Sequence, residues 1–385
     1  MPPKLEKSPS MTQKRKPSIR EVFSPDAHER SHLYSLSWIS AYTALYVSSL
    51  GVAVLSDMKW LLPAILANGF AIGGLFLIGH DAAHGTLFRG RRLNSYVARA
   101  TLLPSLTPLA HWKHAHNLRH HGFTNLRPND YGWAPKSLQE YRLMPASRRA
   151  LERFYRTVPG MSLYWIIEIW WKHLIRLHPE DARALSKYKL ASLERTLVFS
   201  FAVAIALVSV AALWATVGWT QHPLECTVRL ASATILPHIF WCWLMGTVIF
   251  LHHTHPCIVW WNDRDRWRRE ASQARTSVHV QLPRLIDLML LDIFSHTAHH
   301  VDPGISSERL AAEQKILEEV GPEKVLVEKL TFEYFFKVVR GCKLYDFAAQ
   351  QWIGYSGKAS FPELTEQCSA KSGNSGCVVN CRRQA

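Results

Sequence analysis

The sequence predicts an all-α, multi-pass membrane protein with four transmembrane helices in two hairpins and a helical cytosolic cap that carries histidine clusters. Hydrophobic residues make up 48% of the 385 residues, and they gather in long blocks separated by polar segments. Four of these blocks are long enough to cross the hydrocarbon core of a bilayer, which takes about 20 helical residues. The polar segments between and after the blocks hold the histidine clusters, so we expect the cap there.

The four predicted spans form two pairs with short connections. They cover residues 33–55, 60–79, 196–218 and 230–251. The link SDMK joins the first pair and WTQHPLECTVR joins the second, and such short links place neighbouring helices antiparallel. We assign residues 1–32 to a polar, basic N-terminal tail, residues 33–355 to one membrane domain, and residues 356–385 to a disordered C-terminal tail.

The distribution of lysine and arginine predicts the orientation of the chain. These residues are frequent before the first span and between the second and third spans, whereas the short links hold only Lys59 and Arg229 at their edges. Because cytosolic loops carry the excess of positive charge, both termini and the middle segment should face the cytosol of a bacterial inner membrane or of the endoplasmic reticulum. The formal charge of +15 then reflects this topology and attraction to membrane lipids. No compact basic domain stands apart from the spans, so we expect no nucleic-acid partner.

Two further segments are predicted to lie at the boundary between the headgroups and the acyl chains. Residues 93–112 are apolar but are interrupted by Pro104 and Pro108. Residues 161–177 are rich in tryptophan and too short for a full span. For residues 161–177, a core helix inside the cytosolic cap is the alternative interpretation.

Three histidine clusters share the spacing of a helical face. Residues three or four apart lie on the same side of a helix, so each cluster can direct its imidazoles to one point. The predicted topology places all three clusters on one side of the membrane, which gives eight imidazoles, enough for two metal ions with open positions. The clusters are His80 and His84 in GHDAAHG, His116, His120 and His121 in HNLRHHGFTN, and His296, His299 and His300 in HTAHHVDPG.

A metal site explains these clusters better than a structural role does. A lone histidine is usually a surface residue or a satisfied core residue, but three regularly spaced clusters beside membrane spans are hard to obtain by chance. Imidazoles without thiolates argue against structural zinc or an iron–sulfur cluster, and eight ligands exceed the three that a catalytic zinc ion commonly takes. A pair of iron ions that handles dioxygen fits such a ligand set. The histidines that fit no such spacing keep the structural interpretation, and they are His111, His114, His173, His178 and His238.

The three clusters, in this order and with these flanking spans, resemble the histidine boxes of the membrane fatty acid desaturase family. The stretches HGFTNLRPNDYGWAP, LHHTHP, HTAHHVDPGI and CKLYDF are most similar to its acyl-lipid omega-6 (delta-12) branch. The resemblance runs from about Ser35 to Trp352. It implies an enzyme that uses two iron ions and dioxygen to introduce a double bond into a fatty acyl lipid, with the eight box histidines as catalytic metal ligands.

The resemblance also implies groups outside the boxes. A ninth metal ligand is expected in the last turn of the fourth span, where His253 is the first choice, His255 the second, and His252 a neighbour. Carboxylates should accept the outer N–H groups of the ligating imidazoles, and Asp81, Asp130 and Asp292 are candidates by their proximity in sequence. For these three, a surface or capping role is the alternative. No haem-binding HPGG stretch is present, so electrons should come from a separate donor, a ferredoxin or a cytochrome b5.

Other functions remain as alternatives at this stage. The first box has Ala82 and Ala83 where many relatives carry Cys-Gly, which keeps a fatty acyl acetylenase or hydroxylase of the same family open. A membrane metal transporter would belong to another class, but transporters place their ligands near the bilayer midplane, where only His238 is expected here. An inactive relative that only binds lipid is the third alternative, and the complete boxes give it no support.

Overall fold

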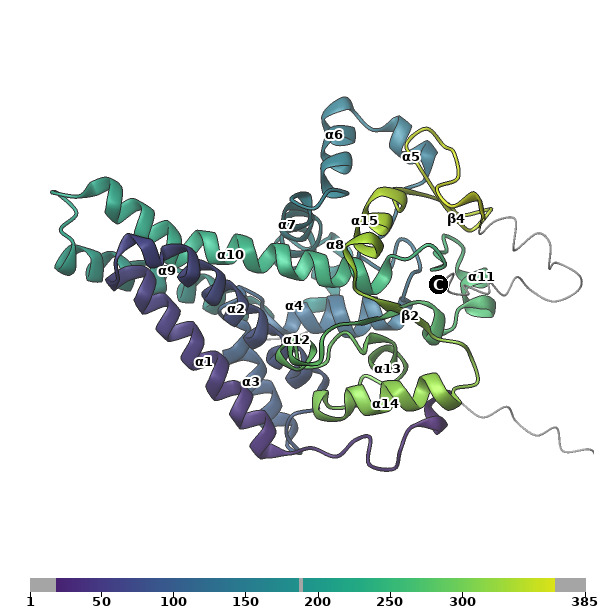
Figure 1. The fold of residues 1–385 in the computed structure, drawn as a ribbon, viewed down its shortest axis with the longest axis horizontal. Helices are drawn as coiled ribbons and strands as arrows, with labels where there is room; N and C mark the ends of the chain where they lie inside the picture. The colour runs from purple at the N-terminus through teal and green to yellow at the C-terminus, as the bar shows by residue number, and fades with distance from the viewer. Residues whose placement is uncertain (1–18, 187–189, 364–385) are drawn as a thin grey trace, which may run out of the picture.

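The computed structural model describes residues 19–186 and 190–363, which are mostly helical (Figure 1). Four of these helices are long and apolar enough to cross a membrane. They are α1 (His32–Leu55), α2 (Leu61–His84), α9 (Ala191–Thr216) and α10 (Pro223–His253). Each predicted span is thus confirmed as a helix, but three boundaries were wrong. Helix α9 begins at Ala191 and not at residue 196, and α10 begins at Pro223 and not at residue 230. Helix α2 continues to His84, so the first histidine cluster forms its last turn.

Local sequence explains where the first two long helices begin and end. The hydroxyl of Ser31 accepts the backbone N–H of Tyr34 at the start of α1, which satisfies one of the free donors of the first turn. Helix α2 ends at Gly85, whose φ of 81° lies in the left-handed region that glycine adopts without strain. This glycine stops the helix directly after His84, at the edge of the histidine clusters.

Helix α2 is the central helix of the four. It packs against α1, α10 and α3, and 67% of its most apolar window is buried, compared with 17% for α9. The approach of α2 to α10 is close because Gly69 has no side chain: a Cβ atom there would lie 2.6 Å from the backbone oxygen of Pro237. Helix α9 keeps large apolar side chains exposed, such as Leu207 and Val208, as expected of a helix that faces lipid.

Two short turns, η1 (Ile19–Val22) and η2 (Met58–Trp60), precede α1 and α2. The other elements lie in two polar segments, each of which follows a long helix that ends in histidines. After α2 come α3 (Arg91–Leu102), α4 (Leu109–Trp112), the π-helix η3 (Lys113–His120), η4 (His121–Phe123), α5 (Leu138–Leu143), α6 (Ala146–Tyr155), α7 (Gly160–Tyr164), the π-helix η5 (Trp165–Ile175) and α8 (Pro179–Leu185). After α10 come α11 (Arg264–Glu270), η6 (Gln273–Arg275), α12 (Arg284–Met289), α13 (His296–Val301), α14 (Ser307–Val320) and α15 (Phe332–Gly341).

The prediction of an all-α chain needs one correction, because the second polar segment contains two small sheets. Strand β1 (Val278–Gln281) pairs in parallel with β2 (Leu326–Lys329), and β3 (Leu344–Asp346) pairs antiparallel with β4 (Gln351–Ile353). These strands have three or four residues each. A run this short is too brief for an alternating pattern to be recognised in the sequence.

The two segments predicted at the membrane boundary form helices against the long ones. Residues 93–112 fold as α3 and α4; α3 packs along α2, with Leu93 and Tyr96 exposed on its outer face. Residues 161–177 fold mainly as α7 and η5, whose Trp165 and Ile169 are buried in the main hydrophobic core. Both segments therefore cover the central helices near their histidine ends.

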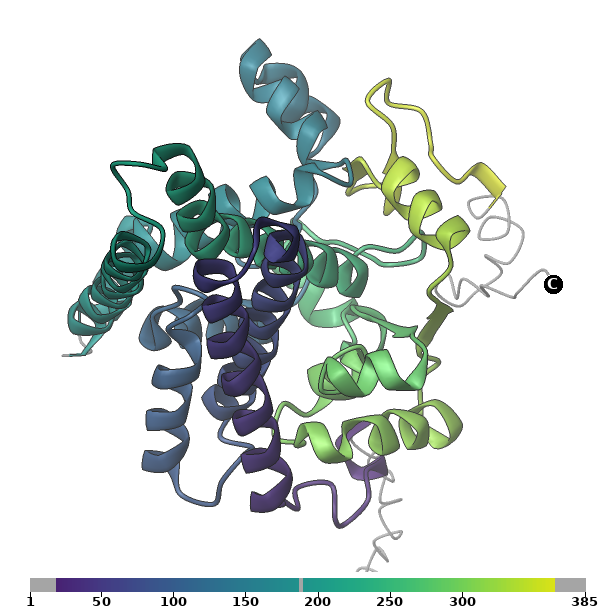
Figure 2. The same cartoon turned by 60° about the vertical axis from the view of Figure 1, so that its left-hand side comes forward.

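Parts of both predicted tails pack onto the fold. Arg20 Nε donates to the carbonyl of Val301 at 2.8 Å, and the backbone N–H of Ser24 donates to Glu313 at 2.9 Å. Figures 1 and 2 both show α14 (light green) beside this N-terminal stretch (purple). At the other end, the N–H of Ser360 donates to the carbonyl of Trp352 at 2.9 Å. The rest of the two predicted tails, residues 1–18 and 364–385, lies outside the described residues.

A glycine-to-alanine pair tests the close packing of α2 on α10. We expect Gly69→Ala to destabilise the protein by about 1–3 kcal/mol, because the new methyl group meets backbone that cannot rotate away. Gly51→Ala in α1 is the matched control, since a Cβ there meets nothing within 4 Å, and it should be neutral or slightly stabilising. Thermal unfolding of the detergent-solubilised protein, followed by tryptophan fluorescence, gives both values. Equal melting temperatures would contradict the packing.

Candidate metal centre

Nine histidines form two adjacent sets, and within each set the ring nitrogens lie within 4.8 Å of one another. The five-histidine set consists of His80, His84, His116, His121 and His299. The four-histidine set consists of His120, His253, His296 and His300. The structure thus brings together all eight box histidines and His253, the first choice for a ninth ligand. The two sets are in direct contact, because the ring of His121 in one set stacks on that of His300 in the other, with centroids 4.5 Å apart.

Two pairs of adjacent residues divide the histidines between the sets. His120 and His300 enter the four-histidine set, whereas their neighbours His121 and His299 enter the five-histidine set. Successive residues of a helix point about 100° apart, so one HH pair can direct its two imidazoles to two neighbouring points. The HH dipeptides in the second and third boxes are therefore the feature that turns one histidine cluster into two.

The second box achieves this division through a π-helix. The N–H of His121 donates to the carbonyl of His116, five residues earlier, at the end of η3. In an α-helix these two side chains would point about 140° apart, and His121 would turn away from His116. The wider turn brings them onto one side, and their Nε2 atoms lie 3.1 Å apart. A π-helix of this kind is rare and occurs mostly at functional sites.

The nitrogens of each set face one another at short range. In the five-histidine set, Nε2 of His116 lies 2.9 Å from that of His80, and Nε2 of His299 lies 3.1 Å from that of His121. In the four-histidine set, Nε2 of His296 lies 3.0 Å from the Nε2 atoms of both His253 and His300. Seven imidazoles from four parts of the chain therefore converge on two points.

Hydrogen bonds made by the Nδ1 atoms of His253 and His80 show that the Nε2 atoms of these two rings carry lone pairs directed into the histidine sets. Nδ1 of His253 lies 3.1 Å from the carbonyl oxygen of Thr276, which can only accept, so the proton of this imidazole sits on Nδ1. In the same way Nδ1 of His80 donates to the carboxylate of Asp81 at 2.9 Å. The Nε2 atoms of both rings are then unprotonated acceptors. Nε2 of His84 is buried and, among the described residues, has no hydrogen-bond partner. Such a donor set fits a cation at each point.

Burial keeps the imidazoles neutral, which is the form that binds a metal. Burial lowers the pKa of His116, His121 and His299, and the neighbouring imidazoles lower it further. The same two causes lower the pKa of His296 and His300. We expect these rings to stay unprotonated well below pH 6.5, the ordinary pKa of histidine.

The three predicted carboxylates have different outcomes. Asp81 and Asp130 accept the Nδ1–H groups of His80 and His120, each at 2.9 Å. Burial alone would raise the pKa of Asp130, but the adjacent His120 and the N–H of Gly132 lower it, so the carboxylate stays charged. The prediction for Asp292 was wrong. Backbone φ angles of 53° and 55° at Leu291 and Asp292 turn this carboxylate toward an ion pair with Arg284.

The histidines that were not chosen as ligands lie outside both sets. His255, the second choice for the ninth ligand, lies 3.2 Å from a carboxylate oxygen of Glu328 through its Nε2. His252 is a neighbour, as predicted: its ring stacks on that of His296 with centroids 3.7 Å apart. The five histidines with a predicted structural role (111, 114, 173, 178 and 238) belong to neither set.

A buried aspartate that the sequence did not reveal anchors the second box. Asp181 of α8 accepts hydrogen bonds from His114 at 2.8 Å, from Arg119 at 2.9 Å and from the hydroxyl of Tyr131 at 2.9 Å. His114 and Arg119 are both part of η3, so Asp181 holds the π-helix that carries His116 and His120. Burial raises the pKa of Asp181, but these donors outweigh it and lower the pKa overall. Because 67 residues separate Asp181 from His114, no local pattern could have indicated the contact.

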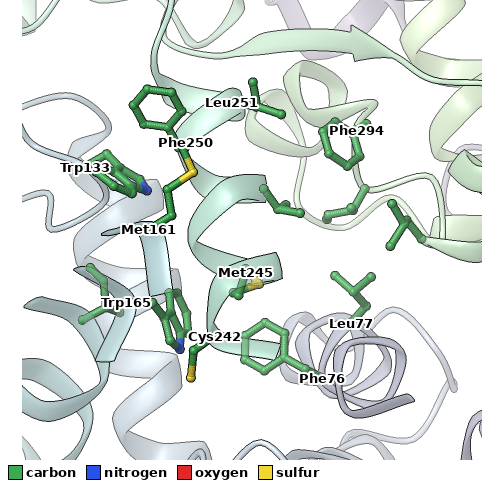
Figure 3. Packing of buried hydrophobic residues seen from close by; sticks show 14 of the residues in the cluster. Phe76, Leu77, Trp133, Met161, Trp165, Cys242, Met245, Phe250, Leu251 and Phe294 are labelled. Atoms are coloured by element: carbon green, nitrogen blue, oxygen red, sulfur yellow. The ribbon is translucent and has the colours of Figure 1, made fainter. Parts of the chain in front are cut away.

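An apolar cavity of about 60 Å³ lies against both sets, between α2 and α10. Figure 3 shows Phe76, Leu77, Trp165 and Met245, four of the side chains that line it. Its polar wall is formed by histidines of the two sets and by their neighbours. They are His80, His116, His120, His252, His253 and His296, with Tyr131 beside them. An apolar chamber that ends on two metal-binding points suits a hydrocarbon substrate and an oxidising metal.

Comparison with known proteins identifies the family. Residues 58–331 match the sequence profile of the family described as fatty acid desaturase. The chain belongs to the fatty acid desaturase family. The matched region contains both histidine sets and the cavity, so the resemblance of the histidine boxes is confirmed. As a member of this family with four apolar helices, the desaturase is a membrane oxidoreductase, and a metal transporter is not favoured.

Several relatives of the desaturase carry names that specify a reaction. An sn-1 oleoyl-lipid 12-desaturase of Picosynechococcus sp. is 27% identical over 91% of this chain and 95% of the relative. A chloroplastic omega-6 fatty acid desaturase of Spinacia oleracea is 28% identical over 80% of this chain and 65% of the relative. An sn-1 oleoyl-lipid 12-desaturase of Synechocystis sp. is 27% identical over 81% of this chain and 84% of the relative. These names support the omega-6 branch that the sequence resembles.

Two adjacent carboxylates test the anchoring of the π-helix. We expect Asp181→Asn to lower the free energy of unfolding by about 3 kcal/mol, because Arg119 loses its buried counter-charge. Glu180→Gln is the control, since Glu180 is 73% exposed and lies 3.8 Å from the same arginine, whereas the side chain of Asp181 is 1% exposed. Thermal unfolding compares the two variants. Similar melting temperatures would show that Asp181 does not anchor η3.

Proposed function

We propose that this chain is a membrane-bound fatty acyl desaturase of the omega-6 (delta-12) type, which uses dioxygen and two iron ions to introduce a double bond into an acyl-lipid chain. The observation that carries this proposal is the position of the two histidine sets at the end of an apolar cavity. The names of the relatives support the type of reaction and the lipid-bound substrate.

The five-histidine set would hold one iron ion and the four-histidine set the other. Bound iron would supply, with dioxygen, an oxidant strong enough to remove hydrogen from an unactivated methylene, which no acid–base side chain can do. The protein provides the ligand arrangement. Asp81, Asp130 and the carbonyl of Thr276 fix the protons of three imidazoles on their outer nitrogens, so that the inner nitrogens point at the two metal positions.

The cavity would select and position the hydrocarbon chain. Phe76 and Trp165 pack edge to face with centroids 6.1 Å apart, and with Met245 they give the cavity an apolar wall that excludes water. His80 of one set and His296 of the other both line this cavity, so a chain in the cavity would contact ligands of both metal positions. This placement favours two successive hydrogen removals from neighbouring carbons.

The desaturase domain would correspond to residues 33–355, with α1–α2 and α9–α10 as two transmembrane hairpins under a histidine-bearing cap. Both hairpin connections are short, and they lie at the helix ends opposite to the histidines. Lysine and arginine are frequent in the segments on the histidine side. The positive-inside rule therefore supports a cytosolic location for the histidine sets and for both termini, in a bacterial inner membrane or the endoplasmic reticulum.

Desaturation is favoured over hydroxylation or triple-bond formation by the names of the relatives, which specify 12-desaturases and omega-6 desaturases. Ala82 and Ala83 replace the usual Cys-Gly of the first box, and both are buried on α2 between His80 and His84. Neither belongs to the lining of the cavity in the described part of the chain. An effect of this departure would therefore act through the neighbouring histidines and not through contact with a substrate in this cavity.

Product analysis tests the proposed reaction. In a host rich in monounsaturated lipid, the wild-type chain should produce diunsaturated acyl lipids, detected by gas chromatography and mass spectrometry. His120→Ala and His299→Ala should abolish this product while the protein still inserts into the membrane. His178→Ala, at an exposed histidine outside both sets, should retain full activity. A hydroxylated product would instead identify a fatty acyl hydroxylase, and a product with a triple bond would identify an acetylenase.

Iron content tests the ligand assignment separately from activity. The purified wild-type chain should hold about two iron ions, since the histidines form two sets. We expect His253→Ala to lose about one of them, because His253 belongs to the four-histidine set and its Nε2 lies 3.0 Å from that of His296. His255→Ala should keep both. Iron would be measured by inductively coupled plasma mass spectrometry, and equal iron loss in the two variants would refute the assignment of His253.

A further inference from the structure

The proposed reaction needs electrons from outside the substrate. Reducing one dioxygen to two waters takes four electrons and four protons. The two methylene groups supply two of each when they lose two hydrogens and form the double bond. The other two electrons and two protons must come from an external reductant and from solvent. A protein carrier that delivers one electron at a time therefore has to dock near one of the histidine sets.

The five-histidine set is the one nearer to water. His84, His116 and His121 are only partly buried, whereas all members of the four-histidine set are buried. The apolar cavity, which the substrate would fill, lies against both sets, so the difference in burial is what distinguishes them. Electrons should therefore enter from the outer side of the five-histidine set, at the second box.

A strongly basic helix lies directly against this box. Helix α11 has the sequence RDRWRRE, with four arginines in seven residues. Arg266 pairs with Glu270 at 2.9 Å and Arg268 lies 3.6 Å from Asp265. Three more arginines are exposed, and no carboxylate of the described chain pairs with them. They are Arg264 and Arg269 of α11 and Arg275 of η6.

Aromatic contacts connect this helix to His121. The indole N–H of Trp267 donates to the carbonyl of Thr124 at 3.0 Å, and its ring lies 5.9 Å from that of Phe123. The guanidinium of Arg264 lies over Phe123, 5.2 Å from the ring centroid. Phe123 follows His121 by two residues, so the basic surface is joined to a member of the five-histidine set by packed side chains and a short stretch of backbone.

We infer that α11, with Arg275, is the docking surface for an acidic one-electron carrier protein, which delivers electrons to the five-histidine set through the Trp267–Phe123 contact. This inference rests on the proposed function. The charge of the surface selects the partner, because unpaired arginines around an exposed entry point attract and orient a negatively charged protein.

The position of α11 favours a protein partner over the membrane surface. Figure 1 shows α11 at the end of the long axis of the molecule opposite to the connection between α9 and α10. In the proposed topology that connection lies beyond the far side of the bilayer. Electrostatic attraction to anionic headgroups falls off within about 8 Å at physiological salt, so a surface this far along the cap is accessible to a soluble carrier.

Charge reversal on α11 tests the inference. The iron-loaded full-length chain would be placed in lipid nanodiscs that contain monounsaturated phospholipid, with an acidic plant-type ferredoxin, its reductase and NADPH. We expect Arg264→Glu/Arg269→Glu to raise the KM for ferredoxin at low salt by at least about tenfold, and to weaken the dependence of the rate on ionic strength. Lys337→Glu/Arg340→Glu is the matched control, because it reverses two exposed charges on α15. Its KM should stay within about twofold of the wild type.

A second measurement separates docking from chemistry. Each variant would be reduced by photoreduced deazaflavin without any carrier and then mixed with oxygen, and the product of this single turnover would be measured. Equal yields in the wild type and in Arg264→Glu/Arg269→Glu, together with the raised KM, support the docking surface. An unchanged KM in that variant, or an equal rise in the α15 control, overturns it. If the wild type gives no diunsaturated product after chemical reduction, the proposed function fails, whatever the KM values are.

Discussion

Imidazole nitrogens that converge on two points inside the fold are the constraint on which the rest of this structure depends. The carbonyl of Thr276 and the carboxylate of Asp81 place protons on the outer nitrogens of His253 and His80. The inner nitrogens of these two rings therefore carry lone pairs, and each lies about 3 Å from another imidazole nitrogen, as in the 3.0 Å contact between His253 and His296. A cation at each point would take these nitrogens as ligands. Much of the fold can be understood as the means of holding nine imidazoles in this arrangement.

Three features of the fold support this arrangement: the histidine segments themselves, the carboxylates that hold them, and the long helices behind them. The HH pairs and the π-helix divide the imidazoles between two points. Asp81, Asp130 and Asp181 then hold those segments, either through the imidazole itself or, for Asp181, through His114 and Arg119. Helices α2 and α10 supply both the ends that carry His84 and His253 and the apolar cavity between them. The membrane helices are therefore part of the candidate site as well as its anchor.

Much of the candidate site could be predicted from the sequence because its histidines follow helical spacing. The i, i+4 pairs His80/His84 and His296/His300 each fall within one set, as helical spacing predicts. The pair His116/His120 is divided between the two sets, because η3 is a π-helix. Spacing could not show that His120 and His121 belong to different sets, because the π-helix depends on packing around η3. His253 lies between His252 and His255 in LHHTHP, so spacing could not single it out, and only the resemblance to desaturases indicated it. Contacts over long separations, such as Asp181 with His114, leave no local pattern.

The errors in the predicted fold have the same origin. Apolar blocks gave the four long helices, but they could not give the start of α10 at Pro223, because its first turns include polar residues that the hydrophobic pattern excludes. Asp292 was assigned to the site from its distance along the chain to His296. The chain turns at Leu291 with a positive φ, which the sequence gives no reason to expect at a leucine.

The most direct test of the central claim is an experimental structure of the purified full-length chain, with anomalous scattering measured on both sides of the iron absorption edge. The account predicts two iron peaks, one enclosed by the five-histidine set and the other by the four-histidine set. A single peak, a peak bound outside these sets, or zinc in tetrahedral coordination at either position would contradict it.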